Sequence, residues 1–301
     1  MAPDIACGFY YLHFSDPTKA AAEGALLRYR FADLSFGYAS MSAWPQAGDE
    51  TLAEKLKHLK RNPSMEPQWS WAFLDAELRR EGRAALPSGT QVPDSHWHLR
   101  SDDLANPDRW PELVAQGHRY WKLKISPSLV ESLPLRELAE FARSNDVKLR
   151  LDANGSYMSR SELELLFAAL GEVDVIDFFE DPSTKEELWV EIRQTWGVPV
   201  ASDWIRPAHD EFDLSVYKPS RDANFDERKE FVITTAFDHP LGLNYTAYRS
   251  IQLKSHPLLR MPLGISHPGL YDCGGIESRV TLGGIGFGWD EMLKKISWEP
   301  L

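Results

Sequence analysis

The sequence predicts an α/β protein in which an N-terminal α+β capping domain precedes a modified (β/α) barrel of the TIM type. Three observations support this prediction. Over most of the chain, short apolar runs alternate with helical stretches, which is typical of parallel strands joined by helices. These units are numerous and carry no glycine-rich phosphate-binding motif, which favours a barrel over a dinucleotide-binding sheet. About the first 90 residues lack this alternation and mix strand-like with helical pieces.

We expect the capping domain to cover residues 1–91, with residues 285–301 packing back onto it, and the barrel to cover residues 92–284. Alternating residues indicate strands in the capping domain, whereas leucines at helical spacing, with acidic residues early and lysines late, indicate helices. The predicted elements of this domain are strand 23–31, strand 35–44, helix 48–60 and helix 67–83.

The barrel region consists of short apolar runs separated by amphipathic stretches. Its predicted elements are strand 119–125, helix 130–145, strand 147–153, helix 158–171, strand 173–182, helix 183–196, strand 198–203 and strand 214–220. The interval between the last two strands is too short for a full helix, so we expect a loop or a single turn there.

The composition limits the possible partners and location. Lys and Arg number 33 and Asp and Glu number 45, so the formal net charge is −12, which argues against nucleic acid or an anionic membrane as the main partner. An anionic substrate would need local cations or a bound metal. Two cysteines are too few for a disulfide framework, and we find neither a secretory signal nor a run of membrane-spanning length. We expect a cytoplasmic protein.

The run "RYWKLKI" at residues 119–125 carries Lys122 and Lys124 on one predicted strand. Alternate side chains of a strand share a face, so both ammonium groups should point the same way. Two like charges on one side of a buried strand are unfavourable unless something uses them. Solvated lysines on a surface strand are the ordinary explanation, but the ends of the following strands argue against it.

Carboxylates stand at the ends of the next three predicted strands, and another lysine stands at the end of the fourth. In order, these residues are Asp152, Glu180, Asp203 and Lys218. The carboxyl ends of parallel barrel strands meet at one mouth. Three carboxylates that converge there suit a hard divalent cation such as Mg²⁺. The sequence therefore predicts a magnesium site flanked by lysines.

The order of these motifs resembles a known family. Lys-x-Lys, Asp-x-Asn, Glu-Asp-Pro, Ser-Asp and Lys-Pro follow one another as in the muconate-lactonizing subgroup of the enolase superfamily, and within it the chain is most similar to the o-succinylbenzoate synthases. The segments "TTAFDHPLG" (234–242), "HPGLYD" (267–272) and "GIGFGWD" (284–290) are similar to the family's seventh-strand, eighth-strand and closing segments. "FDHP" stands where Glu-Ser-Ser is more usual.

The resemblance implies a Mg²⁺-dependent lyase, with Mn²⁺ as an alternative cation. Its reaction would be the syn-dehydration of 2-succinyl-6-hydroxy-2,4-cyclohexadiene-1-carboxylate to o-succinylbenzoate in menaquinone synthesis, through an enediolate. The resemblance assigns Asp152, Glu180 and Asp203 to the metal. It makes Lys124 the base that removes the α proton and then the acid, and Lys122 the neighbour that makes this lysine easier to deprotonate.

The same resemblance implies roles for the remaining residues. Lys218 would stabilise the intermediate electrostatically through a cation–π contact. Asn154 would orient a metal ligand. Thr234 and Thr235 would hold the succinyl carboxylate, with Gly269 as a further substrate-binding position. The expected partner is a small-molecule carboxylate, with no nucleic acid and no membrane.

Two other functions remain open. Racemases and epimerases of the same subgroup use two facing lysines on N-acylated amino acids or dipeptides, and Asp272 in "LYDCGG" could recognise an ammonium group. His96 and His98 in "HWH" share a strand face and could bind a metal, as in metal-dependent hydrolases. Ordinary packing is the favoured interpretation of both histidines, because no further histidine stands at the end of a later strand.

Two charged residues beside the predicted ligands have ordinary interpretations. Arg150 alternates with Asp152 and shares its face, so it could support the site from below or form an ion pair in the barrel core. Asp181 precedes a proline and is interpreted as the cap of a helix start, outside the site.

Overall fold

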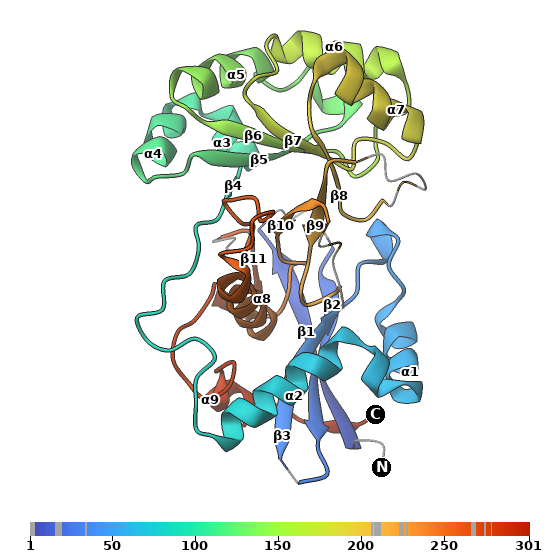
Figure 1. Cartoon of the computed structure of the whole chain (residues 1–301), viewed down its shortest axis with the longest axis vertical. Coiled ribbons are helices and arrows are strands. Elements are labelled where there is room, and N and C mark those ends of the chain that lie inside the picture. Colours follow the sequence, from blue (N-terminus) through green and yellow to red (C-terminus); the bar gives the residue numbers. More distant parts are fainter. Residues whose placement is uncertain are drawn as a thin grey trace.

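The computed structural model describes residues 4–15, 20–33, 35–205, 207, 212–222, 226, 228–265, 269–273, 275–277 and 279–301. A seven-stranded parallel sheet curls into the barrel, and a six-stranded antiparallel sheet forms the centre of the capping domain. The barrel strands with helices α3–α7 form the upper part of Figure 1, and the capping sheet with helices α1 and α2 forms the lower part. This arrangement confirms the predicted fold class. In the described part of the chain no helix is long and apolar enough to cross a membrane.

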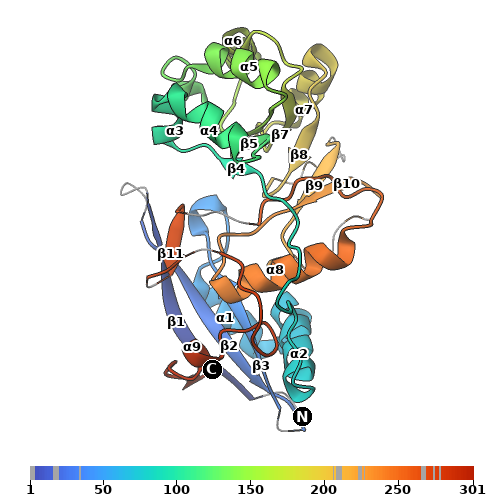
Figure 2. The ribbon, with the colours of Figure 1, turned by 90° about the vertical axis from the view of Figure 1, so that its left-hand side faces the viewer.

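The capping sheet is built around its longest strand, β1. The strand order is β12–β11–β1–β2–β3, and β13 also pairs with β1. The strands are β1 (Asp4–Phe14), β2 (Ala22–Arg30), β3 (Phe36–Ser42), β11 (Tyr271–Cys273), β12 (Ile276–Glu277) and β13 (Glu299–Pro300). Segments from the far end of the sequence therefore complete a sheet that begins at β1, as the red strands beside the blue ones show in Figure 2.

Two helices pack against this sheet, α1 (Leu52–Arg61) and α2 (Pro67–Arg80). Helix α1 begins with a capping box, in which the Thr51 hydroxyl accepts from the Glu54 N–H and the Glu54 carboxylate accepts from the Thr51 N–H. Helix α2 approaches the sheet so closely that a Cβ on Gly37 would overlap the carbonyl oxygen of Ala72. A glycine is therefore required where the helix crosses β3.

The barrel strands are parallel and follow one another in sequence order, from β4 to β10. They are β4 (Trp97–His98), β5 (Tyr120–Lys124), β6 (Lys148–Asp152), β7 (Ile176–Glu180), β8 (Val200–Ser202), β9 (Leu214–Tyr217) and β10 (Glu230–Ile233). The later helices are α3 (Ser101–Ala105), α4 (Trp110–Ala115), α5 (Leu135–Ser144), α6 (Arg160–Leu170), α7 (Glu186–Glu191), α8 (Pro240–Leu253) and α9 (Asp290–Leu293). Shorter helical turns are η1 (Pro45–Ala47), η2 (Pro63–Met65), η3 (Pro107–Arg109), η4 (Pro127–Leu129) and η5 (Ile192–Trp196).

An irregular segment joins β10 to β4 and closes the barrel. Gly264 exchanges two backbone hydrogen bonds with residues 233–235 at the end of β10, and Leu263 exchanges two with residues 94–96 before β4. The four N···O distances lie between 2.7 and 3.0 Å. This segment takes the place of an eighth strand, and it brings the end of β10 next to the start of β4.

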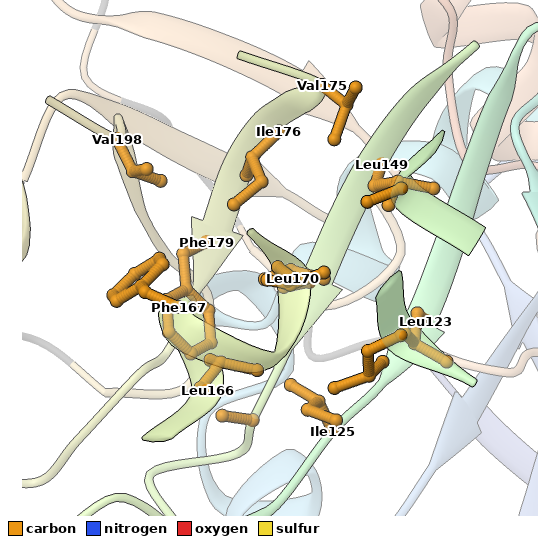
Figure 3. Close-up of a cluster of buried hydrophobic side chains, with 14 of the residues drawn as sticks. Leu123, Ile125, Leu149, Leu166, Phe167, Leu170, Val175, Ile176, Phe179 and Val198 are labelled. Carbon is orange, nitrogen blue, oxygen red and sulfur yellow. The ribbon is translucent and has the colours of Figure 1, made fainter. Parts of the chain in front are cut away.

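The largest apolar cluster fills the space between the barrel strands and their outer helices. Figure 3 shows side chains of α6 facing those of the neighbouring strands β5, β6 and β7. The labelled side chains are Leu123, Ile125, Leu149, Leu166, Phe167, Leu170, Val175, Ile176, Phe179 and Val198. Burial of a side chain of this size contributes about 1.5–3 kcal/mol to stability, so this cluster holds the strand ends in a fixed arrangement.

Some elements differ from those that the sequence predicted. Strand β1 and helix α8 were not expected, because both are buried on more than one side and so lack a simple polar–apolar period. Helices α3 and α4 were also not expected, and both are short. The helix predicted over 130–145 begins only at Leu135, after Pro134. Between β8 and β9 no helix is present among the residues that are described.

The C-terminal segment is anchored to helix α2. The buried carboxylate of Asp75 accepts hydrogen bonds from the N–H of Phe287 at 2.7 Å and from that of Tyr38 at 2.9 Å. Arg79 bridges the same carboxylate to Asp290. We propose the boundaries 1–91, 92–284 and 285–301 for the two domains and the returning segment, with β11 and β12 contributed to the capping sheet from the barrel range.

Candidate active site

Most of the predicted site residues lie together at the mouth of the barrel. The backbone register places Lys124 beside Asp152 and Asp152 beside Glu180, so the ends of β5, β6 and β7 are level. A cavity of about 50 Å³ opens there. It is lined by His96, His98, Lys122, Lys124, Asp152, Asn154, Glu180, Asp203, Trp204, Lys218, Thr234, Thr235, Phe237 and Gly264. Of the predicted residues, Arg150 and Gly269 are not part of this lining.

The two lysines of β5 meet the carboxylate of Asp152. Nζ of Lys122 lies 2.8 Å from Oδ2 of Asp152 and 2.7 and 2.8 Å from the two carboxylate oxygens of Glu180. Nζ of Lys124 lies 2.7 Å from the same Oδ2 of Asp152. The Lys122 side chain is 9% exposed and that of Lys124 is 47% exposed. Lys122 is therefore fixed between two carboxylates, whereas Lys124 faces solvent.

A second group of charges surrounds Asp203. The ammonium of Lys218 forms an ion pair with one oxygen of Asp203, and Nη2 of Arg221 lies 3.1 Å from the other. Both cations lie over the indole ring of Trp204, with Nζ of Lys218 at 4.9 Å and Cζ of Arg221 at 4.2 Å from its centroid. Sequence reasoning missed Arg221, for which the only signal is its position three residues after Lys218.

Burial and neighbouring charges shift the pKa values of this cluster in opposite directions. Burial acts to lower the pKa of Lys122, but Asp152 and Glu180 outweigh it and raise that pKa above its ordinary value. Burial and the Asp152 charge raise the pKa of Glu180 to about 8. Burial also opposes ionisation of Asp152 and Asp203, yet the adjacent lysines hold both pKa values below their usual range. Burial lowers the pKa of Lys218.

Asp181 is not the helix cap that the sequence predicted, since α7 begins only at Glu186. Its backbone has a φ of 42°, and its buried carboxylate turns toward the loop that follows β8. There it accepts hydrogen bonds from the N–H of Asp203 at 3.0 Å and from that of Trp204 at 2.9 Å. Burial and the Asp203 charge raise the pKa of Asp181 to about 7. Asp181 therefore fixes the backbone that carries the third predicted ligand.

Arg150 forms the ion pair in the barrel core that was one of its two expected roles. Its side chain is fully buried, and its Nε lies 2.8 Å from Oδ2 of Asp177. Its Nη1 lies 2.7 Å from the carbonyl oxygen of Pro262 and 2.9 Å from Nδ1 of His96. Arg150 therefore reaches the cavity only through this histidine.

His96 and His98 contact each other, with 3.1 Å between their Nε2 atoms. Histidines that hold zinc direct a ring nitrogen to the metal at about 2.0–2.1 Å. Here both ring nitrogens of His96 are taken, one by Arg150 and the other by His98. This arrangement gives no support to the metal-dependent hydrolase considered from the sequence.

The other predicted positions differ in their surroundings. Thr234 and Thr235 are buried at the cavity, and within the described part of the chain Oγ1 of Thr234 has no hydrogen-bond partner. Gly269 is exposed just before β11, because the chain has turned toward the capping sheet there. Asp272 lies on β11, where its carboxylate accepts a hydrogen bond from the N–H of Gly275 at 2.9 Å, and it is not part of the cavity lining.

The carboxylates fit a hard divalent cation in their chemistry. Asp152, Glu180 and Asp203 are each at most 3% exposed and offer the oxygen atoms that Mg²⁺ prefers. Oδ1 of Asp152 is buried and has no hydrogen-bond partner among the described residues, and a cation would satisfy it. The carboxylates are joined to lysines, and among the described residues no three His, Cys, Asp or Glu side chains form a ready-made metal site. The donor set therefore fits, although the side chains are arranged as ion pairs.

Comparison with known proteins finds similarity to o-succinylbenzoate synthases. Residues 13–78 match the family model described as the o-succinylbenzoate synthase N-terminal domain. The chain is 25% identical over 309 aligned residues to the o-succinylbenzoate synthase of Bdellovibrio bacteriovorus, and the alignment covers 93% of this chain and 92% of that protein. In sequence, the chain therefore resembles o-succinylbenzoate synthases.

Solved structures with the enolase-superfamily fold match nearly the whole chain. The o-succinylbenzoate synthase of Thermosynechococcus elongatus BP-1, described as complexed with Mg in the active site, is 17% identical, with a TM-score of 0.68 over 97% of this chain and 100% of that one. An enolase-superfamily member from Listeria innocua is 15% identical, with a TM-score of 0.69 over 99% of this chain and 98% of that one. These similarities concern the fold.

Proposed function

We propose that this protein is a Mg²⁺-dependent o-succinylbenzoate synthase of the enolase superfamily, a carbon–oxygen lyase of menaquinone biosynthesis. Its reaction is the syn-dehydration of 2-succinyl-6-hydroxy-2,4-cyclohexadiene-1-carboxylate. The observation that carries this proposal is one cavity lined by a lysine pair, three carboxylates and a third lysine. The match to the o-succinylbenzoate synthase N-terminal domain and the 25% identical curated relative support the choice of substrate.

Lys124 is the proposed base and acid. Its half-exposed ammonium at the rim is the lysine of the pair that can move toward a substrate. The α C–H bond breaks, its proton passes to the lone pair of Nζ of the unprotonated Lys124, and the electron pair of the broken bond remains in the substrate. The C–O bond then breaks, the hydroxyl takes the proton from the same Nζ and leaves as water, and the electron pair completes the aromatic ring. One group that serves both steps explains a syn elimination.

Lys122 and Lys218 are the proposed electrostatic partners of this base. Lys122 is bound to the same carboxylate oxygen as Lys124, so it places a fixed positive charge beside the proposed base. Lys218 reaches the cavity from β9, and its contact with the ring of Trp204 is of the kind proposed for the conjugated ring of the substrate.

Asp152, Glu180 and Asp203 are the proposed ligands of the metal, and Asn154 is proposed to orient a ligand. A divalent cation held there would bind the substrate carboxylate and stabilise the negative charge that develops as the α proton leaves. The three carboxylates are buried, and each is paired with a lysine of the same cavity.

Thr234 and Thr235 are proposed to hold the succinyl carboxylate, since both residues line the cavity and no described residue forms a hydrogen bond with Oγ1 of Thr234. Gly269 is proposed as a further substrate-binding position, although the cavity lining does not include it. A cytoplasmic location belongs to the same proposal, because both cysteines, Cys7 and Cys273, are free thiols.

The alternative within the superfamily is racemisation of N-acylated amino acids or dipeptides. It is favoured by the placement of Lys124 and Lys218 on different strands of one cavity, where they could act as two bases. Asp272, whose carboxylate is bound to a turn outside the cavity, does not favour it.

A direct comparison of the two reactions tests the proposal. Loss of the diene substrate is followed by ultraviolet absorbance with Mg²⁺ present, and racemisation of N-succinyl amino acids is followed by polarimetry on the same preparation. We expect dehydration to have the higher kcat/KM. Racemisation with the higher kcat/KM would replace the proposed reaction by the alternative.

A further inference from the structure

A single turn of the chain carries both cations that bind Asp203. The turn follows β9, and the carbonyl oxygen of Lys218 accepts hydrogen bonds from the N–H groups of Arg221 at 2.9 Å and Asp222 at 2.8 Å. The Asp222 carboxylate accepts in turn from the N–H of Lys218 at 2.9 Å. The two cations bind different oxygens of Asp203, with Lys218 on Oδ2 and Arg221 on Oδ1. The turn therefore presents a lysine and an arginine at a fixed spacing to one carboxylate.

The two cations are not held equally. Arg221 also donates to both oxygens of Asp222, from Nε at 2.9 Å and from Nη2 at 3.2 Å. A guanidinium carries its donors in one rigid plane, so these two bonds fix the place of Nη2, which binds Asp203. Among the described residues, Asp203 is the only carboxylate that forms an ion pair with Lys218. Arg221 is therefore the fixed partner of Asp203, and Lys218 is the partner that can give up its oxygen.

Arg221 reaches Asp203 from outside the active-site cavity. Lys218 and Asp203 both line that cavity, whereas Arg221 is not part of its lining. Arg221 instead lines a separate cavity of about 120 Å³, whose walls also include Trp44 and Gln68 of the capping domain. One oxygen of the proposed metal ligand is thus bound by a cation of the cavity itself, and the other is bound by a cation that stands behind the cavity.

Asp152, the first proposed ligand, is arranged in a similar way. Its Oδ2 binds both Lys122 and Lys124, and its Oδ1 has no hydrogen-bond partner within the described part of the chain. Mg²⁺ is small and requires a nearly octahedral set of oxygen ligands, whereas Ca²⁺ takes more oxygens and accepts both atoms of one carboxylate. Aspartates with one oxygen already occupied by the protein therefore suit the smaller ion.

We propose that Arg221 is a positioning residue which keeps Oδ1 of Asp203 occupied, so that this aspartate offers one oxygen to a divalent cation and the site prefers Mg²⁺ to Ca²⁺. The proposal rests on the proposed function and adds the reason for its choice of metal. Without Arg221 the carboxylate can offer both oxygens, as Ca²⁺ accepts. The positive charge of Arg221 cannot itself produce the preference, because it acts equally on two ions of the same charge.

Calorimetric titration of the metal-free chain with MgCl₂ and with CaCl₂ tests this proposal. Arg221→Met keeps the apolar stem of the side chain and removes every donor. Loss of a residue behind a metal ligand commonly weakens metal binding by about 10–100-fold. We expect the ratio of the Ca²⁺ Kd to the Mg²⁺ Kd to fall about tenfold. Loss of a charge or partial unfolding would change both Kd values by the same factor, and an unchanged ratio would overturn the proposal.

Arg221→Lys is the second variant, because it keeps a positive charge between Asp203 and Asp222. A single ammonium cannot reproduce the planar fork of the guanidinium, so the ratio should fall in this variant as well. If Arg221→Met loses the circular dichroism of the folded chain, Arg221→Lys alone decides. A folded Arg221→Lys variant with the ratio of the unmodified chain would show that the charge is sufficient, and the proposal would be wrong.

Arg143→Met is the matched control. Arg143 also binds two carboxylates, those of Glu172 and Asp174, but it does so on the barrel surface. This variant likewise removes a guanidinium from between two acidic side chains. It should change neither Kd, and a fall in the ratio equal to that of Arg221→Met would contradict the assigned role.

The dehydration assay on the same preparations separates this inference from the proposed function. If the unmodified chain does not dehydrate the diene but the ratio falls in the Arg221 variants, the proposed reaction is wrong and the role of Arg221 stands. If the chain dehydrates the diene and the ratio does not change, only the role of Arg221 is wrong. An unmodified chain that binds neither cation would overturn both.

Discussion

Lys122 and Lys124 bind the same oxygen atom, with Oδ2 of Asp152 at 2.8 Å from Nζ of the first and 2.7 Å from Nζ of the second. They differ in what else holds them. Lys122 is buried and also binds Glu180, whereas nearly half of the Lys124 side chain is exposed. One lysine is thus a fixed charge and the other is able to move, which is the division of roles that a base and its electrostatic neighbour require.

The first prediction concerns these lysines. Lys124→Ala should abolish exchange of the substrate α proton in D₂O, because general base catalysis contributes about 10²–10⁴-fold and no other group is proposed for it. Lys122→Ala should keep part of the activity, since the proposed base remains and only the fixed charge beside it is lost. NMR of the α proton and initial rates measure both effects. Identical behaviour of the two variants would contradict the assigned roles.

The second prediction concerns the metal. A chelator should abolish the activity, and Mg²⁺ or Mn²⁺ should restore it. Asp152→Asn, Glu180→Gln and Asp203→Asn should each weaken Mg²⁺ binding, measured by calorimetry, without loss of the circular dichroism of the folded chain. Stoichiometric zinc bound through His96 and His98 would argue instead for a hydrolase.

The third prediction concerns Asp181, which holds the loop of the third proposed ligand through the backbone N–H groups of Asp203 and Trp204. Asp181→Asn should weaken Mg²⁺ binding by about 10–100-fold, as substitutions behind metal ligands commonly do. Asp174→Asn is the control, because Asp174 forms an exposed ion pair with Arg143 on the barrel surface. Equal Mg²⁺ affinities in the two variants would show that the loop does not depend on Asp181.

The fourth prediction concerns stability at low pH. His239 is buried at the start of α8, where its Nδ1 accepts a hydrogen bond from the N–H of Leu241, and burial lowers its pKa to about 3. In the unfolded chain its pKa is about 6.5. Protonation therefore favours unfolding, so the stability due to neutral His239 is complete above pH 6.5 and is lost as the pH falls from there toward 3.

The His239→Asn variant isolates this contribution, since asparagine also caps helices well. Between pH 6.5 and 5, the free energy of unfolding should fall by about 2 kcal/mol more in the unmodified chain than in the variant. Urea unfolding followed by circular dichroism at several pH values provides the measurement. Parallel pH dependences would mean that His239 is not held neutral by the fold.

The sequence predicted the helices and strands that are buried on one side only. Helix α6, expected over 158–171 and observed over Arg160–Leu170, has such a face and a serine cap. Strand β1 was not expected because four consecutive residues, 5–8, are buried. Helix α8 was not expected because nine of its residues are buried on several sides. The polar–apolar periodicity of a segment does not identify a helix or strand that is packed on several sides by other elements.

The candidate site was predictable where strand ends determine it. Asp152 and Glu180 are the last residues of β6 and β7, so the order of the strands is sufficient to bring them together. Asp181 and Arg221 were missed because loop conformation determines their contacts. A positive φ turns Asp181 back toward the loop after β8, and Arg221 reaches Asp203 from the turn after β9. Neither conformation follows from the local sequence.

The arrangement of the capping sheet has a consequence for how the chain is made. Strand β1 pairs with β2 close by in the sequence, but also with β11 near Phe14 and with β13 near Cys7. During synthesis by the ribosome, β1 emerges long before residues 271–300, which provide these last two partners. Its unpaired edge is therefore exposed while the whole barrel is being made, and closure over such a long loop is slow. The nascent chain is thus most prone to aggregate through β1 until residues 271–300 have been made and have paired with that strand.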